Sequence, residues 1–199
     1  HTRYIGDWSS DVCSSDLTRF VPPESQPWFP GIRKKPNDAF MCRPVLLHPK
    51  SRGQLKLRSP DPSVPMAICQ NFLSEPEDWE TFRTGFEMVR EVAAQKPLDK
   101  FRGKELNPGS DCKTRSEIDK FIRRTAWTVH HPLGTCKMGG DGDEMAVVDT
   151  QLRVRGLEAL RVVDASVMPD MPGGNINAPV IAMAERASDL IRGRDPLKV

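Results

Sequence analysis

The sequence has no long apolar run, no strong excess of either charge and no CxxC pair of cysteines. None of its apolar stretches approaches the roughly 20 residues that span a bilayer, and no basic start followed by an apolar core indicates a signal peptide. A formal net charge of +2 over 199 residues gives no electrostatic footprint for nucleic acid. Five cysteines without metal-site spacing argue against a disulfide framework or a zinc ribbon. We therefore expect a cytoplasmic protein, with no nucleic-acid partner, no indicated membrane association and no metal.

The first 17 residues form a separate part of the sequence. Within them, residues 7–17 (DWSSDVCSSDL) resemble a translated DNA-sequencing adapter and have no hydrophobic period with which to bury a face. The alternative is a polar, flexible leader. On the adapter interpretation, 1–17 is non-native, Cys13 is not a natural residue, and the natural protein begins near Thr18 in a gene cut off upstream.

Three short strand-like runs follow an irregular loop at 18–39, which is rich in proline, tryptophan and charge. The runs cover residues 40–47, 54–58 and 66–72. In the second, QLKLR, leucines alternate with polar residues, which is typical of a half-buried strand. A turn built on Pro49 and Gly53 separates the first two. The links are too short for helical crossovers, so we expect an antiparallel sheet.

Helical spacing replaces the strand pattern further along. Ser74 and Glu77 have the spacing of a capping box before a helix over 77–95, and TRSE (114–117) is a second capping box before a helix that ends near Trp127. One face of the first helix is formed by Trp79, Phe82, Phe86, Val89 and Val92 or Ala93. One face of the second helix is formed by Ile118, Phe121, Ile122 and Thr125.

The last third predicts a buried strand and a final helix. Residues 160–163 are short, apolar and β-branched, which suits the strand. The helix has Asn177 as a plausible N-cap, Pro179 in its first turn and Gly193 as its stop. Its expected buried face is Ile181, Ala184, Ala187 or Ser188, and Ile191.

The stretch TVHHPLGTCKMGG (128–140) holds the chemistry-bearing residues between these elements. The adjacent histidines His130 and His131 make a poor chelate, because neighbouring side chains point apart and no third ligand stands at metal spacing. A nucleophilic Cys136 needs a helix N-terminus or a cationic neighbour, and Lys137 is expected to point elsewhere. A hydrogen-bonded structural histidine is the default for any lone histidine.

The order of several motifs changes that default. H-P-x-G-T-C-x-M (131–138) is followed by R-V-V-D-A-S-x-M-P (161–169) and by G-N-x-N-A-P (174–179), while HPKSRGQLKLRSPDPSVP (48–65) and AICQNFLS (67–74) lie upstream. Together these resemble the glucose-methanol-choline (GMC) oxidoreductases, flavoproteins that oxidise alcohols, and within them the choline and aliphatic-alcohol dehydrogenases. The likeness runs from about residue 18 to 194 and is strong at 48–73 and 128–193.

The resemblance implies a truncated α+β fold. Residues 18–127 would belong to an antiparallel-sheet substrate domain with flanking helices. Residues 128–194 would carry the catalytic loop and the C-terminal strand and helix of an FAD-binding domain, and 195–199 a tail. The family's phosphate-binding G-x-G-x-x-G turn is absent from this sequence. We therefore expect the 199-residue chain alone to show no tight FAD binding and no turnover.

The resemblance also implies the roles of individual residues. His131 corresponds to the catalytic histidine and Asn175 to the second catalytic position, while His130 is interpreted as a lining or structural residue. Asp164, Ala165, Asn177, Ala178 and Pro179 correspond to flavin-contacting positions, with a strand-end cap as the alternative role of Asp164. Histidine suits a general base because its pKa lies nearest the operating pH, and Asn175 can donate a hydrogen bond to a developing alkoxide.

The implied function is oxidation of primary alcohols, choline-like or aliphatic, to aldehydes, with FAD as cofactor and hydride transfer to flavin N5. The implied partners are a small-molecule alcohol and an electron acceptor such as a quinone. Three alternatives stay open: an oxygen-using alcohol oxidase of the same fold, a flavin-dependent hydroxynitrile lyase, and a non-catalytic binding domain. The sequence does not name the alcohol.

Overall fold

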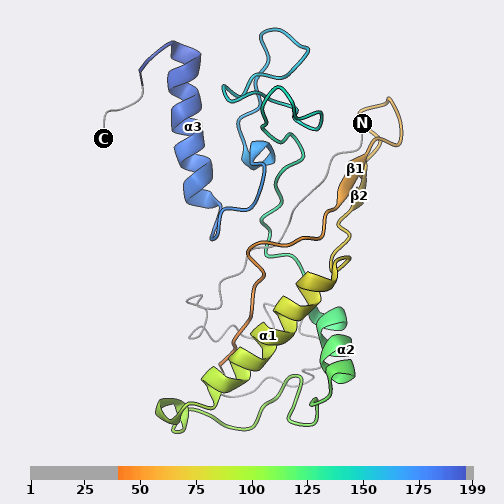
Figure 1. The fold of residues 1–199 in the computed structure, drawn as a ribbon, viewed down its shortest axis with the longest axis vertical. Coiled ribbons are helices and arrows are strands. Elements are labelled where there is room, and N and C mark those ends of the chain that lie inside the picture. The colour runs from red at the N-terminus through yellow and green to blue at the C-terminus, as the bar shows by residue number, and fades with distance from the viewer. Residues whose placement is uncertain (1–39, 196–199) are drawn as a thin grey trace. The chain divides into compact units, whose positions relative to one another are not determined.

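The computed structural model describes residues 40–195, so the expected leader at 1–17 and the loop at 18–39 lie outside the described residues. Its elements are two strands, three α-helices and two 3-10 helices (Figure 1): β1 Gln54–Lys56, β2 Ala67–Cys69, α1 Pro76–Ala93, η3 Lys96–Leu98, α2 Arg115–Thr125, η4 Ala165–Val167 and α3 Asn177–Arg192. The described chain divides into two compact units, one of residues 47–75 and 128–195 and the other of residues 40–46 and 76–127. The α+β content and the antiparallel sheet agree with expectation.

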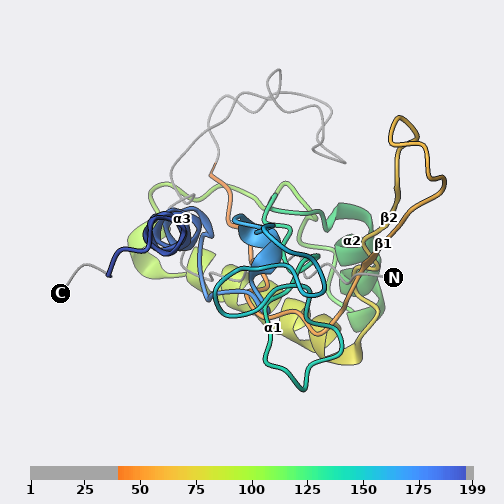
Figure 2. The ribbon, with the colours of Figure 1, turned by 90° about the horizontal axis from the view of Figure 1, so that it is seen from above.

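Strands β1 and β2 form an antiparallel pair in which Leu55 lies opposite Ile68, and a long connection joins them (Figure 2). The expected pairing of runs 54–58 and 66–72 is confirmed, although each strand has only three residues. The expected strand at 40–47 is wrong, because residues 40–46 are irregular. Pro44 removes a backbone donor from this run, and its ring instead lies against Gly85 of α1.

The alternation in QLKLR predicts a half-buried strand, which is confirmed for Leu55 and wrong for Leu57. Leu55 is half-buried, but Leu57 is 82% exposed and Ile68 is 63% exposed. Leu57 lies beyond the end of β1. The described residues of this chain supply no second layer against which a two-stranded ribbon could bury its apolar side chains.

Helices α1 and α2 lie side by side (Figure 1). Their facing apolar positions are buried as the helical spacing predicts: Phe82, Phe86, Ile118 and Ile122. The capping box at the start of α2 is confirmed, with Thr114 and Glu117 making both reciprocal bonds. Helix α1 begins at Pro76, which puts Glu75 rather than the expected Ser74 at the N-cap position.

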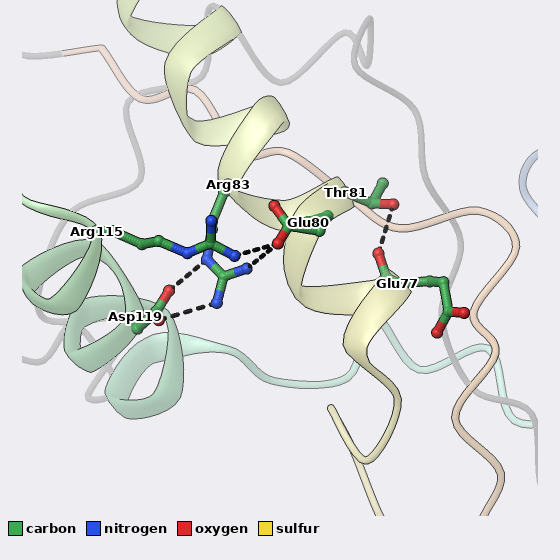
Figure 3. Close-up of polar contacts among 6 residues, drawn as sticks. All are labelled: Glu77, Glu80, Thr81, Arg83, Arg115 and Asp119. Carbon is green, nitrogen blue, oxygen red and sulfur yellow. Dashed lines mark hydrogen bonds and ion pairs between the residues drawn. The ribbon is translucent and has the colours of Figure 1, made fainter.

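A charged network also joins α1 to α2 (Figure 3). The Arg83 guanidinium donates to both carboxylate oxygens of Asp119, at 2.6 and 2.9 Å. Glu80 accepts from Arg83 at 2.9 Å and also from Arg115. The Arg83–Asp119 ion pair therefore links α1 to α2, and Glu80 of α1 makes a second link through Arg115 of α2.

The other unit has its own small core: Val148, Leu152, Val167 and Ala187. Isolated bridges, including Val148 with Val154 and Arg153 with Arg161, connect its loops. The expected buried strand at 160–163 is wrong, since Leu160 is 48% exposed and only Arg161 makes a bridge. Apolar, β-branched content suits a buried strand, but here the run lies at the edge of a loop-built core.

Helix α3 differs from expectation in two ways. Asn177 is its first helical residue, so Ile176 rather than Asn177 is at the N-cap. The expected buried face is largely wrong, because Ile181 and Ile191 are 55% and 60% exposed while Ala187 is fully buried. Gly193 ends the helix in the left-handed conformation, with φ at 63°, as expected.

Candidate active site

His131 lies in a loop whose backbone changes direction on both sides of it. His130 has a φ of 64° and Gly134 a φ of 83°, both in the left-handed region. Histidine is among the few non-glycine residues enriched there, and the His130 N–H donates to Thr128 Oγ1 at 2.9 Å. His131 is half-buried, and Leu133 at 3% exposure anchors the loop two residues further on.

The residues after this loop are hydrogen-bonded to the segment that contains the expected flavin contacts. The Cys136 N–H donates to the Ser166 carbonyl and the Met138 N–H to the Val167 carbonyl, both at 2.8 Å. Val167 is fully buried beneath them. The structure thus hydrogen-bonds residues 136–138, which follow the His131 loop, to residues 166 and 167, two segments that the sequence separates by about thirty positions.

Asp164 is the N-cap of η4, where its carboxylate accepts from the Ser166 N–H at 2.8 Å. The side chain therefore has the capping role that was the alternative to a cofactor contact. Asp164 is exposed and Ala165, the first residue of η4, is half-buried. Their contact with flavin stays a prediction.

The first turn of α3 has the donor set that an electron-rich group needs. Its N-cap Ile176 makes no side-chain hydrogen bond, and the first bond along the helix runs from the Val180 N–H to the Ile176 carbonyl at 2.9 Å. The N–H groups of Asn177 and Ala178 precede it at the positive end of a 16-residue helix, and both residues are exposed. Pro179 has no N–H to offer. This turn fits the electron-rich edge of a flavin ring.

Asn175 is exposed and lies in the connection between η4 and α3, two residues before the helix begins. It belongs to the same compact unit as His131. The pairing of the two side chains across one substrate stays a prediction.

The charged residues beside the motif are paired with each other. Lys137 Nζ lies 2.8 Å from Asp143 Oδ2, and this contact lowers the pKa of the Asp143 carboxyl. Cys136 packs against the apolar core of its unit. Among residues 40–195, no group of three or more histidine, cysteine or acidic side chains could hold a metal ion. None of the helices in this described part is both long and apolar enough to cross a membrane.

Sequence reasoning missed the residues that support the loop carrying Asn175. Arg52 Nη2 lies 3.5 Å from Asp170 Oδ1, and the His48 ring lies beside Gly173. A signal was available, because both sides of these contacts fall within motifs that resemble the same family. Nothing in linear spacing shows that the two motifs meet.

Comparisons with known proteins match most of this chain to one family. The family described as GMC oxidoreductase matches residues 49–184. An oxygen-dependent choline dehydrogenase from Klebsiella pneumoniae is 49% identical over 158 residues, covering 79% of this chain and 28% of that protein. The chain thus spans little more than a quarter of this relative's length.

Solved structures show the same relationship. Pyridoxine 4-oxidase from Mesorbium loti superposes with a TM-score of 0.72 at 35% identity, covering 82% of this chain and 32% of that one. An FAD-dependent oxidoreductase from Chaetomium thermophilum gives a TM-score of 0.70 at 28% identity, covering 75% and 26%. The family model alone matches well over half of the sequence. The chain therefore belongs to the GMC oxidoreductase family, whose members are FAD-dependent flavoproteins.

Proposed function

We propose that this chain carries the catalytic C-terminal part of an FAD-dependent oxidoreductase that converts a primary, choline-like alcohol to the aldehyde. The observation that carries the proposal is the pair of backbone hydrogen bonds that tie the polypeptide after His131 to residues 166 and 167. These bonds connect the segment that follows the candidate base to a candidate cofactor-binding segment. The 49% identity to a choline dehydrogenase supports the choice of substrate class.

In this proposal His131 is the general base. It takes the proton from the alcohol hydroxyl as the C–H bond breaks on the carbon that carries this hydroxyl. A positioned base of this kind raises the rate by about 10²–10⁴. Asn175 donates a hydrogen bond to the oxygen as negative charge develops on it. Holding the alcohol between two loops also fixes the orientation of its C–H bond.

Bound FAD would supply the hydride acceptor, at N5 of its flavin. The N–H groups of Asn177 and Ala178 would hold the electron-rich pyrimidine edge of the ring, where the helix N-terminus favours negative charge. Pro179 would shape the turn, and Asp164 and Ala165 would contact the cofactor from η4. Asp164 can do so with the carboxylate oxygen that does not cap Ser166.

The electron acceptor has two candidates. A quinone suits a dehydrogenase. Molecular oxygen is the second candidate, favoured because the Klebsiella relative is named oxygen-dependent and the Mesorbium neighbour is an oxidase. A dye-linked assay compared with oxygen uptake separates the two, and cleavage of a cyanohydrin without reduction of the flavin would identify a lyase instead.

The test is a chimera in which the matched segment of the Klebsiella enzyme is replaced by the matched segment of this chain. The chimera should oxidise choline or a related alcohol with FAD bound. His131→Ala should lower kcat by at least about 100-fold with FAD absorbance unchanged, whereas the control His130→Phe should cost far less. Near-normal turnover by His131→Ala would remove His131 from the mechanism. A folded, FAD-loaded chimera without alcohol oxidation would refute the proposed function.

A further inference from the structure

Residues 48–53 (HPKSRG) form a rigid support on one side of the Asn175 loop. Ser51 is 3% exposed, and its Oγ accepts from the N–H groups of Ser74 and Glu75 at 3.0 and 3.3 Å. The Arg52 carbonyl accepts from Asn71 Nδ2 at 3.0 Å. Gly53 lies so close to the end of β2 that a Cβ there would be 2.4 Å from the Cys69 carbonyl oxygen. The backbone on both sides of Arg52 is thus fixed by contacts with the end of β2 and with the residues that follow it.

The Arg52 side chain is itself held in place by its own turn. Its Nη1 donates to the Pro49 carbonyl at 2.6 Å and to the Ser51 carbonyl at 3.1 Å. These two bonds within the turn fix the orientation of the planar guanidinium independently of its contact with Asp170. Its second terminal nitrogen, Nη2, then lies 3.5 Å from Asp170 Oδ1. Little side-chain freedom is left to be lost in that contact.

The loop between η4 and α3 meets this support at two places. Asp170 faces Arg52, and its Oδ1 also accepts the Met171 N–H at 2.9 Å, with Met171 only 4% exposed. Gly173 packs against His48, because a Cβ at that position would lie 3.4 Å from Nε2 of the ring. Between and after these contacts the loop turns back on itself, with the Gly174 N–H donating to the Pro172 carbonyl. Asn175 follows at once.

We propose that Arg52 is a positioning residue for the reaction: through its ion pair with Asp170 it fixes the loop that presents Asn175 to the alcohol oxygen. The inference rests on the proposed function. The Asp170 side chain is 67% exposed and the Arg52 side chain 36% exposed, so their ion pair contributes little to the free energy of unfolding. Its effect is geometric, because a displacement of about 1 Å in a reacting group can cost as much as about 100-fold in rate.

The kinetic test uses the chimera described above, with Asp170→Asn and Arg52→Met. Asparagine keeps an acceptor for the Met171 N–H and removes only the charge that faces Arg52. We expect each variant to lower kcat by about three- to tenfold while KM stays within about twofold, since Asn175 acts on the developing alkoxide rather than on alcohol binding. Arg52→Lys should recover part of the loss, because it restores the charge without the bonds to the turn.

The matched control is Asp99→Asn, which breaks an arginine–aspartate pair of similar exposure, Arg102 with Asp99, in the other unit. It should leave kcat unchanged. A second readout is hydrogen exchange of the Met171, Gly173 and Gly174 amides in the 199-residue chain, which should be faster in Asp170→Asn and unchanged in Asp99→Asn. Unchanged exchange, or unchanged kcat in both Arg52→Met and Asp170→Asn, would overturn the inference. If the unmutated chimera oxidises alcohols but these variants behave like it, only this inference fails. A folded, FAD-loaded chimera without alcohol oxidation, together with altered exchange in Asp170→Asn, would refute the proposed function and leave the contact established.

Discussion

Gly53 is the position where adding one methyl group should do the most damage to the support of the candidate site. A Cβ there would lie 2.4 Å from the Cys69 carbonyl oxygen and 2.7 Å from the Gln70 carbonyl oxygen. Because ordinary contact begins near 3.4 Å, the end of β2 must move by about 1 Å. That shift disturbs the adjoining register position of the hairpin, where Gln54 lies opposite Cys69. We expect Gly53→Ala to cost about 1–3 kcal/mol of unfolding free energy.

The assay is urea unfolding of the 199-residue chain followed by circular dichroism, with hydrogen exchange of residues 48–56 as a local readout. Gly142→Ala is the matched control, since a Cβ there meets nothing within 4 Å and its φ is not in the left-handed region. The control should change the unfolding free energy by no more than about 1 kcal/mol. If Gly53→Ala were as stable as Gly142→Ala, with unchanged exchange at 48–56, the close approach to β2 would not constrain this position.

Three further outcomes follow from the contacts. The backbone N–H groups of Thr114 and Lys113 lower the pKa of Glu117 to about 2, from about 4.5 in the unfolded chain. The ionised Glu117 carboxylate therefore stabilises the fold fully above about pH 4.5, and this stabilisation is lost as the pH falls through about 2. The difference in urea midpoint between wild type and Glu117→Gln should narrow over that interval. Asp119→Asn should cost about 0.5–1 kcal/mol in urea unfolding, because the bond to Arg83 is partly screened by solvent. Gly139→Ala should speed amide exchange at 143–148, since its Cβ would lie 2.8 Å from that of Ala146.

The helices of one unit were predictable because their signals are local. The capping box at Thr114 needs only four residues, and the structure has both of its hydrogen bonds. The apolar spacing of α1 and α2 identifies Phe82, Phe86, Ile118 and Ile122 because each helix buries one face against the other. In such a pair the period of the sequence and the burial of the side chains have the same cause.

The other unit was less predictable because its order comes from contacts between distant loops. Helix α3 has apolar residues on more than one side, so periodicity cannot decide which side is buried. The structure buries Ala187 against Val148 and Val167 and leaves Ile181 and Ile191 exposed. The same holds for residues 160–163, whose composition suits a buried strand but whose neighbours supply only single bridges.

The candidate site combines both situations. Local chemistry explains why a histidine suits proton transfer, but only the resemblance among separated motifs selected His131 over His130. The backbone adds a reason that spacing does not contain: His130 takes a left-handed conformation, so the chain turns between two adjacent histidines and gives them different surroundings. Gly53 is a second position whose role the sequence alone predicts only in part. The sequence indicates a turn at Gly53, whereas the structure shows that this position also has no room for a side chain beside the end of β2. In this unit, residues 48–53 of the upstream motif contact the loop that follows the 161–169 motif, through Arg52 with Asp170 and His48 with Gly173. The Arg52 and Asp170 variants test whether one of these contacts matters for the reaction.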